Sequence, residues 1–286
     1  MKLLVTGGRG QVGAELVAFC AARGDEVVAP ERARMDVASR DAVLALVGDL
    51  RPDVIVNLAA RTDVDGCETH PDGAWLTNVL GVRHVAEAAR RFDAHLVHLS
   101  SDYVFDGSKK GAYVEWDEVT PLSVYGRSKA AAEREALWGC PGAAVLRTSW
   151  VCGAAGASNV PKTIVRLLRD DPTRELAFVD DQIGQPTLVE SLVPAIRQLA
   201  VHRRPGIVHI TNEGPVSWHE FAQAVVVAAG GSADQVRSIT TAELVPARPA
   251  PRPANSVLDN TVLRLAGGPS LGHWSEPLSR LVKELQ

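Results

Sequence analysis

The chain has 286 residues, of which 46% are hydrophobic and 22% are charged, and its formal net charge is −4. Such a chain is long and apolar enough to bury a core in one large domain or two, which excludes a disordered or collagen-like protein. It has no long run of one charge sign and no apolar stretch that could span a bilayer, so we expect neither nucleic acid nor a membrane as a partner. The first residues break too early for a secretory signal, so we expect a cytoplasmic protein.

Short β-branched or leucine-rich runs alternate with stretches of helical period through the first half of the chain. The expected strands are Lys2–Thr6, Glu26–Ala29, Val54–Ala59, His95–Ser100 and Ala143–Thr148. The helices expected between them are Val12–Arg23, Ser39–Val47, Ala74–Phe92 and Ser123–Leu137. The first, third and fourth strands are apolar at nearly every position, which is typical of parallel strands covered on both faces. The expected fold class is therefore α/β, a doubly wound parallel sheet of the Rossmann type with a smaller C-terminal substrate-binding region.

Beyond Thr148 the alternation becomes less regular. The elements expected there are a helix over Asn159–Arg169, a strand near Leu176–Val179, a helix over Leu188–His202, a strand Ile207–Thr211 and a helix Trp218–Ala229. The proline-rich stretch Pro246–Pro253 is expected to be an extended loop, because proline interrupts helices. We assign residues 1–147 and about 176–211 to a dinucleotide-binding domain, and residues 148–175 and 212–286 to a substrate domain.

A glycine-rich turn follows the first expected strand and leads directly into a helix. Its glycines, Gly7, Gly10 and Gly13, are spaced as in turns that bind a dinucleotide. One glycine permits a tight turn, a second lets backbone approach a pyrophosphate, and a third lets the helix pack against the strand. The helix N-terminus offers N–H groups and a positive dipole to the phosphates. The cofactor contacts expected in this turn are Gly7, Arg9, Gly10, Gln11, Val12 and Gly13.

The end of the second expected strand bears on the choice between NADPH and NADH. Glu31 could accept a hydrogen bond from a ribose hydroxyl, whereas Arg32 and Arg34 could hold a 2′-phosphate. Together with Arg9 these arginines favour NADPH, and NADH stays open. The further cofactor contacts expected from the topology are Asp36, Val37, Ala59, Ala60 and Thr62.

A phenol and an ammonium group share one helix face. Tyr125 and Lys129 are four residues apart on the helix after the fourth strand, and Ser101 ends that strand at the edge where open α/β sheets bind ligands. Reducing a ketone requires a proton donor for the developing alkoxide, and a phenol with its ordinary pKa of about 10 donates poorly at neutral pH. We expect Lys129 and an oxidised nicotinamide ring to lower that pKa, and Ser101 to bind the carbonyl oxygen.

Longer strings of residues resemble one family over nearly the whole chain. Besides the glycine turn, they are Arg51–Asn57, Thr62–Asp65, Ser100–Gly107, Pro121–Lys129, Arg147–Val151, Asp180–Thr187 and Arg252–Asp259. The most specific strings are Ser-Asp-Tyr-Val-Phe-Asp-Gly and Asp-Asp-Gln-Ile-Gly-Gln-Pro-Thr. On these residues the sequence resembles the extended short-chain dehydrogenases/reductases and, within them, the dTDP-4-dehydrorhamnose reductase family.

The resemblance implies reduction of the C4 ketone of dTDP-4-dehydro-β-L-rhamnose to dTDP-β-L-rhamnose by NADPH or NADH. By position, Ser101, Tyr125 and Lys129 would be the catalytic triad, and Tyr125 and Lys129 would also contact the cofactor. The residues that would bind the sugar are Ser101, Asp102, Tyr103, Tyr125 and Trp150. Some members are dimers with Mg²⁺ held by interface glutamates, and the residues in comparable places are Glu15, Glu190 and Glu284. The resemblance therefore also implies a homodimer that could hold magnesium.

Other functions are open. Nucleotide-sugar epimerases and dehydratases share the glycine turn and Tyr-x-x-x-Lys, although Asp102 is followed here by Tyr103 rather than by the second carboxylate of a dehydratase. A reductase of another dTDP-4-keto-6-deoxysugar would have nearly the same sequence pattern. A non-catalytic dinucleotide-binding subunit is a different class, because the regulatory subunit of methionine adenosyltransferase also resembles this family.

Overall fold

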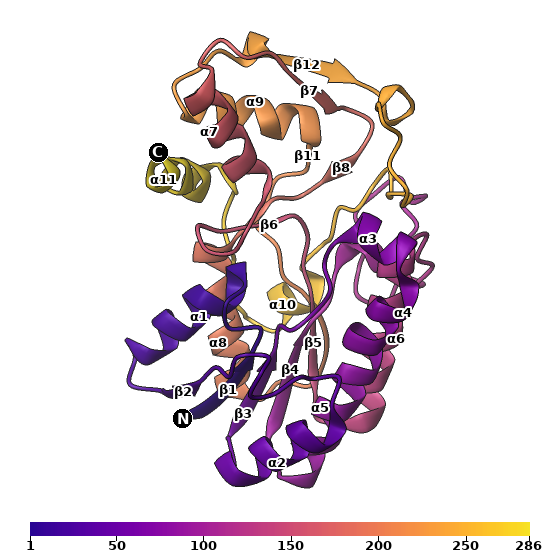
Figure 1. Cartoon of the computed structure of the whole chain (residues 1–286), viewed down its shortest axis with the longest axis vertical. Coiled ribbons are helices and arrows are strands. Elements are labelled where there is room, and N and C mark those ends of the chain that lie inside the picture. Colours follow the sequence, from indigo (N-terminus) through magenta and orange to yellow (C-terminus); the bar gives the residue numbers. More distant parts are fainter.

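The centre of the fold is a parallel sheet of six strands, described in a computed structural model that covers all residues, 1–286 (Figure 1). Its order is β10-β5-β4-β3-β1-β2, and every neighbouring pair is parallel. The strands are β1 (Lys2–Thr6), β2 (Glu26–Val28), β3 (Val54–Asn57), β4 (His95–Leu99), β5 (Ala144–Arg147) and β10 (Gly206–His209). The predicted α/β class with a doubly wound parallel sheet is confirmed.

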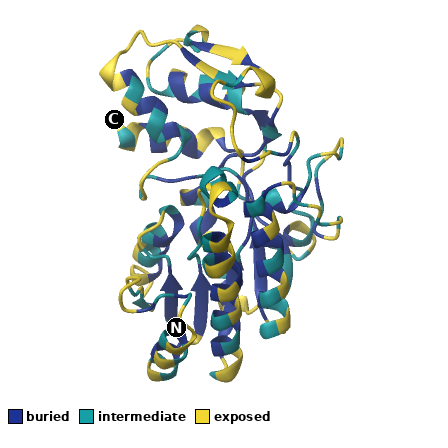
Figure 2. Cartoon of the chain, turned by 45° about the vertical axis from the view of Figure 1, so that its right-hand side comes forward, coloured by how far each residue is buried: buried dark blue, intermediate teal, exposed yellow.

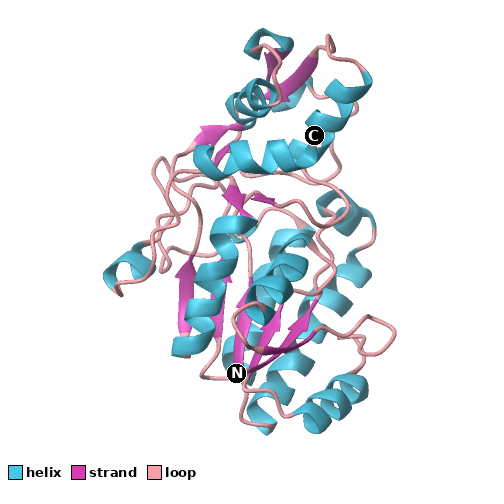
Figure 3. Ribbon diagram, turned by 90° about the vertical axis from the view of Figure 1, so that its left-hand side faces the viewer, coloured by secondary structure: helices cyan, strands magenta, loops and turns pink.

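Helices cover both faces of this sheet, as Figure 3 shows from the side. One face packs against α1 (Gln11–Ala21) and α8 (Val189–His202), and the other against α2 (Arg40–Leu50), α5 (Gly81–Arg91) and α6 (Val124–Gly139). Along β1, Leu3 and Val5 join the first core while Leu4 joins the second, because successive side chains of a strand point to opposite faces. The four inner strands β5, β4, β3 and β1 are accordingly buried at their centres (Figure 2).

The helix expected over Ala74–Phe92 is divided in the structure. The segment between β3 and β4 forms α3 (Val64–Thr69), α4 (Pro71–Ala74), a π-helical turn η1 (Trp75–Leu80) and then α5. The π turn places the buried Asn78 side chain between the backbone of Arg61 and the Ser128 hydroxyl of α6. Apolar periodicity alone gave no sign of this change in helix type, which is common at functional sites.

A second, smaller part lies beyond the carboxyl edge of the sheet, in the upper half of Figure 1. Its helices α7 (Val160–Asp170), α9 (Trp218–Ala228) and α11 (Ser275–Leu285) bury a separate apolar core. Its short strands pair as β7 (Leu176–Val179) with β12 (Val236–Ile239), β8 (Ile183–Gly184) with β11 (Val216–Ser217), and β6 (Val151–Cys152) with β9 (Thr187–Leu188). The remaining short elements are η2 (Asp102–Val104), η3 (Ala233–Gln235), η4 (Thr241–Glu243) and α10 (Thr261–Leu265).

Two sets of elements lie in the other part from the one expected, and β8 and β9 belong with β7 to the first set. β7 was placed with the dinucleotide-binding domain, but it pairs with β12 and its Leu176 belongs to the upper core. Conversely α10, expected in the substrate domain, packs against β10, and its Leu263 joins the sheet core. With these two corrections, the division into a dinucleotide-binding and a substrate domain stays a proposal. The stretch 246–253 contains no helix or strand, as expected, and no helix of the chain combines the length and apolar character needed to cross a membrane.

A buried ion pair ties the ends of β4 and β5 to α6. Arg147, the last residue of β5, donates to the Glu133 carboxylate through Nε (2.9 Å) and Nη2 (2.7 Å), and both side chains are almost fully buried. The hydroxyl of Ser100, just after β4, donates to the same carboxylate at 2.5 Å. These bonds compensate both buried charges and fix the segments that follow β4 and β5 relative to α6.

Removing the Glu133 carboxylate should destabilise the protein strongly. Glu133→Ala leaves the Arg147 guanidinium buried without its partner, which costs about 3–5 kcal/mol of unfolding free energy. Urea denaturation measures this loss. Glu135→Ala is the matched control, because Glu135 lies on the same helix and pairs with Arg83, whose side chain is 57% exposed. We expect that control to lose less than about 1 kcal/mol, and equal losses would contradict a structural role for the buried pair.

Candidate active site

A single large cavity of about 1190 Å³ lies between the carboxyl edge of the sheet and the smaller part of the chain. It is lined from the ends of β1, β3, β4 and β5, from α6, and from the segment after β5. Arg34, expected beside a 2′-phosphate, does not line this cavity. The other expected cofactor and sugar residues lie in its wall, namely Gly7, Arg9, Gly10, Gln11, Val12, Gly13, Arg32, Asp36, Val37, Ala59, Ala60, Thr62, Ser101, Asp102, Tyr103, Tyr125, Lys129 and Trp150. The sequence reasoning therefore gathered residues that the fold brings together, and their individual roles stay predictions.

The glycine turn is shaped by close backbone contacts. Gly7 has φ +67°, and a Cβ there would lie 2.9 Å from the backbone of Leu58 and Ala59. A Cβ on Gly13 would lie 2.2 Å from the carbonyl oxygen of Gly7. Both positions therefore admit only glycine, the first for its left-handed backbone and the second for the packing of α1 on the turn. The cavity reaches the turn at backbone level, as binding of a pyrophosphate requires.

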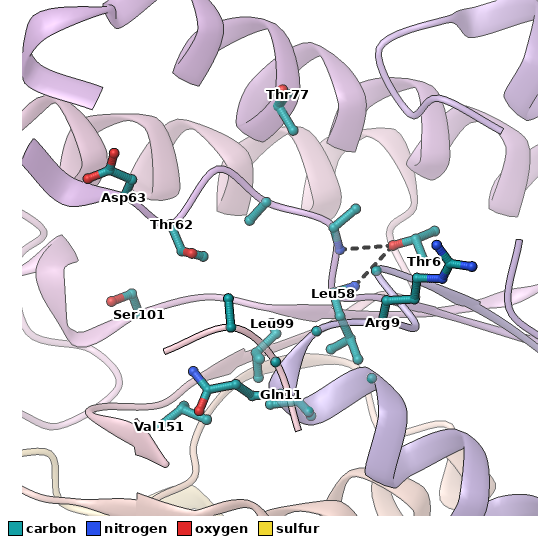
Figure 4. A pocket seen from close by; sticks show the side chains of 18 of the residues that line it. Thr6, Arg9, Gln11, Leu58, Thr62, Asp63, Thr77, Leu99, Ser101 and Val151 are labelled. Carbon is teal, nitrogen blue, oxygen red and sulfur yellow. Dashed lines mark hydrogen bonds between the residues drawn. The ribbon is translucent and has the colours of Figure 1, made fainter. Parts of the chain in front are cut away.

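The hydroxyl of Thr6 joins β1 to β3 at this edge. It donates to Asn57 Oδ1 at 2.6 Å and accepts from the backbone N–H groups of Leu58 (3.1 Å) and Ala59 (3.0 Å), the two bonds drawn in Figure 4. Asn57 in turn contacts the buried ring of His98 on β4 at 3.1 Å. The ends of β1, β3 and β4 are thus held at one level beneath the cavity.

The N-terminus of α1 faces the cavity without a side-chain cap. Gly10 is the capping residue, and it has no side chain to satisfy the first N–H groups of the helix. The Gln11 side chain is occupied elsewhere, since its Oε1 accepts from Gly153 N (3.1 Å) and Asn159 Nδ2 (2.7 Å). In Figure 4 this side chain lies beside Val151, across the cavity from Arg9. The Gln11 side chain therefore links α1 to the smaller part of the chain, and phosphate contacts at this position fall to the backbone.

The far end of the cavity carries two ion pairs. Arg9 of the glycine turn pairs with Glu31, and Arg32 donates to Asp36 at 2.9 Å. A hydrogen bond from Ala38 N, followed by the Arg32 bond, lowers the pKa of Asp36, so this carboxylate is charged at neutral pH. Two guanidinium groups and two carboxylates balance one another here. This end of the cavity could thus accept either a ribose hydroxyl or, after rearrangement of the Arg9 pair, a 2′-phosphate.

Ser101, Tyr125 and Lys129 all line the cavity away from the Arg9 and Arg32 ion pairs. Ser123 caps α6 by accepting from Gly126 N at 3.1 Å, so the helix starts at Val124 and carries Tyr125 in its first turn. A Cβ on Gly126 would lie 2.2 Å from the Tyr103 carbonyl oxygen, so glycine lets α6 approach the Ser101–Tyr103 segment closely. Tyr125 and Lys129 are both buried, and Lys129 Nζ donates to the Leu99 carbonyl oxygen at 2.7 Å.

Burial controls the acidity of these groups. It raises the pKa of the Tyr125 phenol far above its ordinary value, a change that the neighbouring Asp102 carboxylate reinforces and a hydrogen bond with Ser101 opposes. In the protein alone loss of hydration dominates the pKa of Tyr125, and the expected lowering by Lys129 together with an oxidised nicotinamide ring stays a prediction. Burial also lowers the pKa of Lys129 to about 8, with the Glu133 charge opposing the change. The ammonium form still predominates at neutral pH.

Asp102 orients the Ser101 hydroxyl by accepting its hydrogen bond. Ser101 Oγ donates to Asp102 Oδ1 at 2.9 Å and accepts from Tyr103 N at 3.2 Å. Burial raises the pKa of the Asp102 carboxyl to about 6, and its second oxygen is buried without a hydrogen-bond partner. The serine hydroxyl is therefore oriented before any ligand enters, with a lone pair free to accept from the Tyr125 phenol.

Trp218 and Thr77 are among the lining residues that the sequence reasoning missed. Trp218, at the start of α9, stacks on Trp150 with ring centroids 3.6 Å apart and planes 9° from parallel. Thr77, on the π turn, also lines the cavity and is shown in Figure 4. No local pattern marks either of them, because each reaches the cavity through a tertiary contact or a change of helix type.

The glutamates expected to hold magnesium do not form a metal site. Glu15 lies near Glu190 and Glu284, whose charges add to burial in raising the pKa of its carboxyl. Glu15 accepts from Ala154 N at 3.3 Å, however, and Glu190 is paired with Arg280 at 2.9 Å. The chain contains no group of three or more His, Cys, Asp or Glu side chains that could hold a metal ion. The magnesium prediction is not supported within this chain, where Glu15 and Glu190 already have other partners.

Comparison with known proteins decides the family. The sequence profile of the RmlD substrate-binding domain matches residues 1–286. The chain belongs to this family. The predicted resemblance to dTDP-4-dehydrorhamnose reductases is thereby confirmed.

Relatives and solved structures agree with that membership. A dTDP-4-dehydrorhamnose reductase of Aggregatibacter actinomycetemcomitans is 38% identical over 292 residues, which cover 98% of this chain and 98% of that protein. A probable dTDP-4,6-dihydroxy-2-methyloxan-3-one 4-ketoreductase of Streptomyces antibioticus is 40% identical and covers 97% of this chain and 93% of its own. The crystal structure of a dTDP-4-dehydrorhamnose reductase from Bacillus anthracis str. Ames in complex with NADP is 33% identical, with a TM-score of 0.94 over 99% of both chains. The fold of this RmlD-family chain is thus that of nicotinamide-dependent dTDP-sugar reductases.

The Arg9–Glu31 pair should set the balance between the two nicotinamide cofactors. Glu31→Gln frees the Arg9 guanidinium for a 2′-phosphate and removes a carboxylate that repels it, so NADPH should bind at least about threefold more tightly relative to NADH. Fluorescence titration with both cofactors measures the ratio of dissociation constants. Glu26→Gln is the control, because Glu26 pairs with Lys2 outside the cavity. An unchanged ratio in Glu31→Gln would show that this pair plays no part in cofactor choice.

Proposed function

We propose that this chain reduces the C4 ketone of dTDP-4-dehydro-β-L-rhamnose to dTDP-β-L-rhamnose with NADPH, and more weakly with NADH. The observation that carries the proposal is that the glycine turn and the Ser101, Tyr125 and Lys129 side chains line one cavity. A dinucleotide bound along the turn would place its reactive ring at the end where those three side chains lie. Membership of the RmlD family and the activities for which its relatives are named support the same reaction.

The chain fits a nicotinamide dinucleotide on its own residues. Gly7 and Gly13 leave a cradle that a Cβ would fill, and the N-terminus of α1 has no side-chain cap. Backbone N–H groups of the turn would hold the pyrophosphate, and Arg9 or Glu31 would contact the adenosine ribose. When bound, the reduced nicotinamide supplies the hydride for the ketone carbon.

The protein side of the reaction is a proton transfer at the C4 oxygen. Tyr125 Oη would give its proton to that oxygen as negative charge develops, and Ser101 Oγ, by turning its one proton from Asp102 toward the sugar, would donate a hydrogen bond to the same oxygen. Lys129 Nζ, held by the Leu99 carbonyl, supplies a fixed positive charge near the phenol. Burial of Tyr125 keeps the phenol protonated in the resting protein, so the donor form is the one that meets the substrate.

A reductase of another dTDP-4-keto-6-deoxyhexose is the second candidate. The relative from Streptomyces antibioticus, named as a probable 4-ketoreductase of a different dTDP-sugar, is 40% identical to this chain. Both candidates require the same transfer at C4 and differ in the sugar. Oxidation of NADPH on a panel of dTDP-4-keto-6-deoxyhexoses, with the C4 configuration of each product determined, separates them. The rhamnose assignment fails if dTDP-4-dehydro-β-L-rhamnose is not the substrate with the highest kcat/KM.

Removing the Tyr125 hydroxyl should abolish proton donation while leaving the cavity intact. Tyr125→Phe should lower kcat about a hundredfold or more, whereas the dissociation constant of NADPH should change by less than about threefold. Steady-state kinetics and fluorescence titration measure the two quantities. Tyr113→Phe is the matched control, because the Tyr113 hydroxyl donates to Asp106 and lies outside the cavity. Near-normal turnover in Tyr125→Phe would mean that another group supplies the proton.

The charge of Lys129 should limit activity at alkaline pH. The kcat/KM for NADPH reports groups of the free enzyme, so it should fall as pH rises through about 8, where buried Lys129 loses its proton. An ordinary lysine would cause such a decline only above about pH 10. Lys129→Arg retains a cation throughout this range, so its lower activity should show no decline between pH 8 and 10. The same alkaline decline in both proteins would assign it to a different group.

A further inference from the structure

The indole of Trp150 occupies a strained and confined position at the sugar end of the cavity. Trp150 follows β5 with φ +44°, in the left-handed region that a tryptophan rarely adopts. Its ring lies against that of Trp218 with centroids 3.6 Å apart, and both residues line the cavity. Trp150 comes from the edge of the central sheet and Trp218 from the smaller part of the chain. The two rings therefore form one wall built from both parts.

The Trp150 ring leaves no room for a side chain at Gly184. A Cβ on Gly184 would lie 2.4 Å from Cε2, 2.6 Å from Cζ2 and 2.7 Å from Nε1 of Trp150, the three nearest atoms it would meet. Gly184 does not have a positive φ, so its own backbone would accept any residue. The indole, and not the chain conformation, therefore requires glycine here. Gly184 lies in the Asp180–Thr187 string, one of the most specific motifs of the sequence, which the proposed reaction leaves without a role.

The backbone around Trp150 is tied to the same motif. Ser149 Oγ donates to the Gln185 carbonyl oxygen at 2.6 Å, and Thr187 N donates to the Trp150 carbonyl oxygen at 3.2 Å. β8, which carries Gly184, pairs with β11, which runs directly into Trp218. The β8–β11 pair, which lies above β6 in Figure 1, thus carries Gly184 and leads into Trp218.

We infer that Gly184 and Trp218 are positioning residues that fix the Trp150 indole against the apolar face of a bound 6-deoxyhexose. The inference rests on the proposed function for the identity of the ligand. An indole held between a neighbouring ring and a bare backbone loses little freedom when a sugar binds, and the ring edge that it leaves toward the cavity can contact C–H groups of the sugar. The motif around Gly184 then serves sugar recognition by leaving space for this ring.

The decisive test is a double-mutant cycle between Gly184 and Trp150. Gly184→Ala should displace the indole and raise KM for the dTDP-4-keto sugar about three- to tenfold, with a smaller change in kcat and in the dissociation constant of NADPH. In a Trp150→Ala background the added methyl group meets no ring, so Gly184→Ala should leave KM unchanged within about twofold. Gly142→Ala is the matched control, because a Cβ there meets nothing within 4 Å. An equal effect of Gly184→Ala in both backgrounds would overturn the inference.

A second readout needs no turnover. Two stacked indoles give an exciton couplet in the far-ultraviolet circular dichroism spectrum, and this couplet should be lost in Trp218→Ala and weakened in Gly184→Ala. Trp138→Ala is the control, because Trp138 is 75% exposed and outside the cavity. Failure of the wild-type chain to reduce any dTDP-4-keto sugar would refute the proposed function alone. A couplet unchanged in Gly184→Ala would refute the positioning role, whatever the substrate.

Discussion

The architecture depends on one close backbone approach, where the turn after β1 meets the end of β3. Gly7 and Gly13 have no room for a Cβ, and the Thr6 hydroxyl satisfies the two N–H groups that follow β3. This contact brings the uncapped N-terminus of α1 to the carboxyl edge of the sheet. Because parallel strands all end at that edge, every functional segment is placed relative to it.

Burial, rather than opposite charge, governs the chemistry of the cavity floor. It raises the pKa of Tyr125 and Asp102 and lowers that of Lys129, so each of these groups is shifted toward its neutral form. The buried Glu133–Arg147 ion pair, in which each charge neutralises the other, holds β5 and α6 together. A nicotinamide and a sugar entering this cavity would therefore meet groups whose positions are already fixed by buried hydrogen bonds.

The sequence predicted those features whose cause is local. Spacing within one or two elements is enough to predict the glycine turn, the alternation of strands and helices, and the Tyr125–Lys129 pair. Because parallel strands end at one edge of the sheet, the residues at those ends line the same cavity. Features that depend on distant contacts were missed. Trp218 reaches the cavity by stacking on Trp150, β7 pairs with β12 across many residues, and the π turn at Asn78 is set by Arg61 and Ser128. The glutamates were expected to bind metal by analogy of position, but Arg280 and a backbone amide already engage two of them.

The most direct test of the account follows a hydride from cofactor to sugar. NADPH carrying deuterium at nicotinamide C4, on each face in separate samples, is incubated with the protein and a dTDP-4-keto-6-deoxyhexose, and the product is examined by mass spectrometry and NMR. The account predicts one deuterium at C4 of the reduced sugar from one of the two labelled faces, with one NADPH consumed for each product molecule. A product altered in configuration without deuterium or consumption of NADPH, or no product at all, would contradict it.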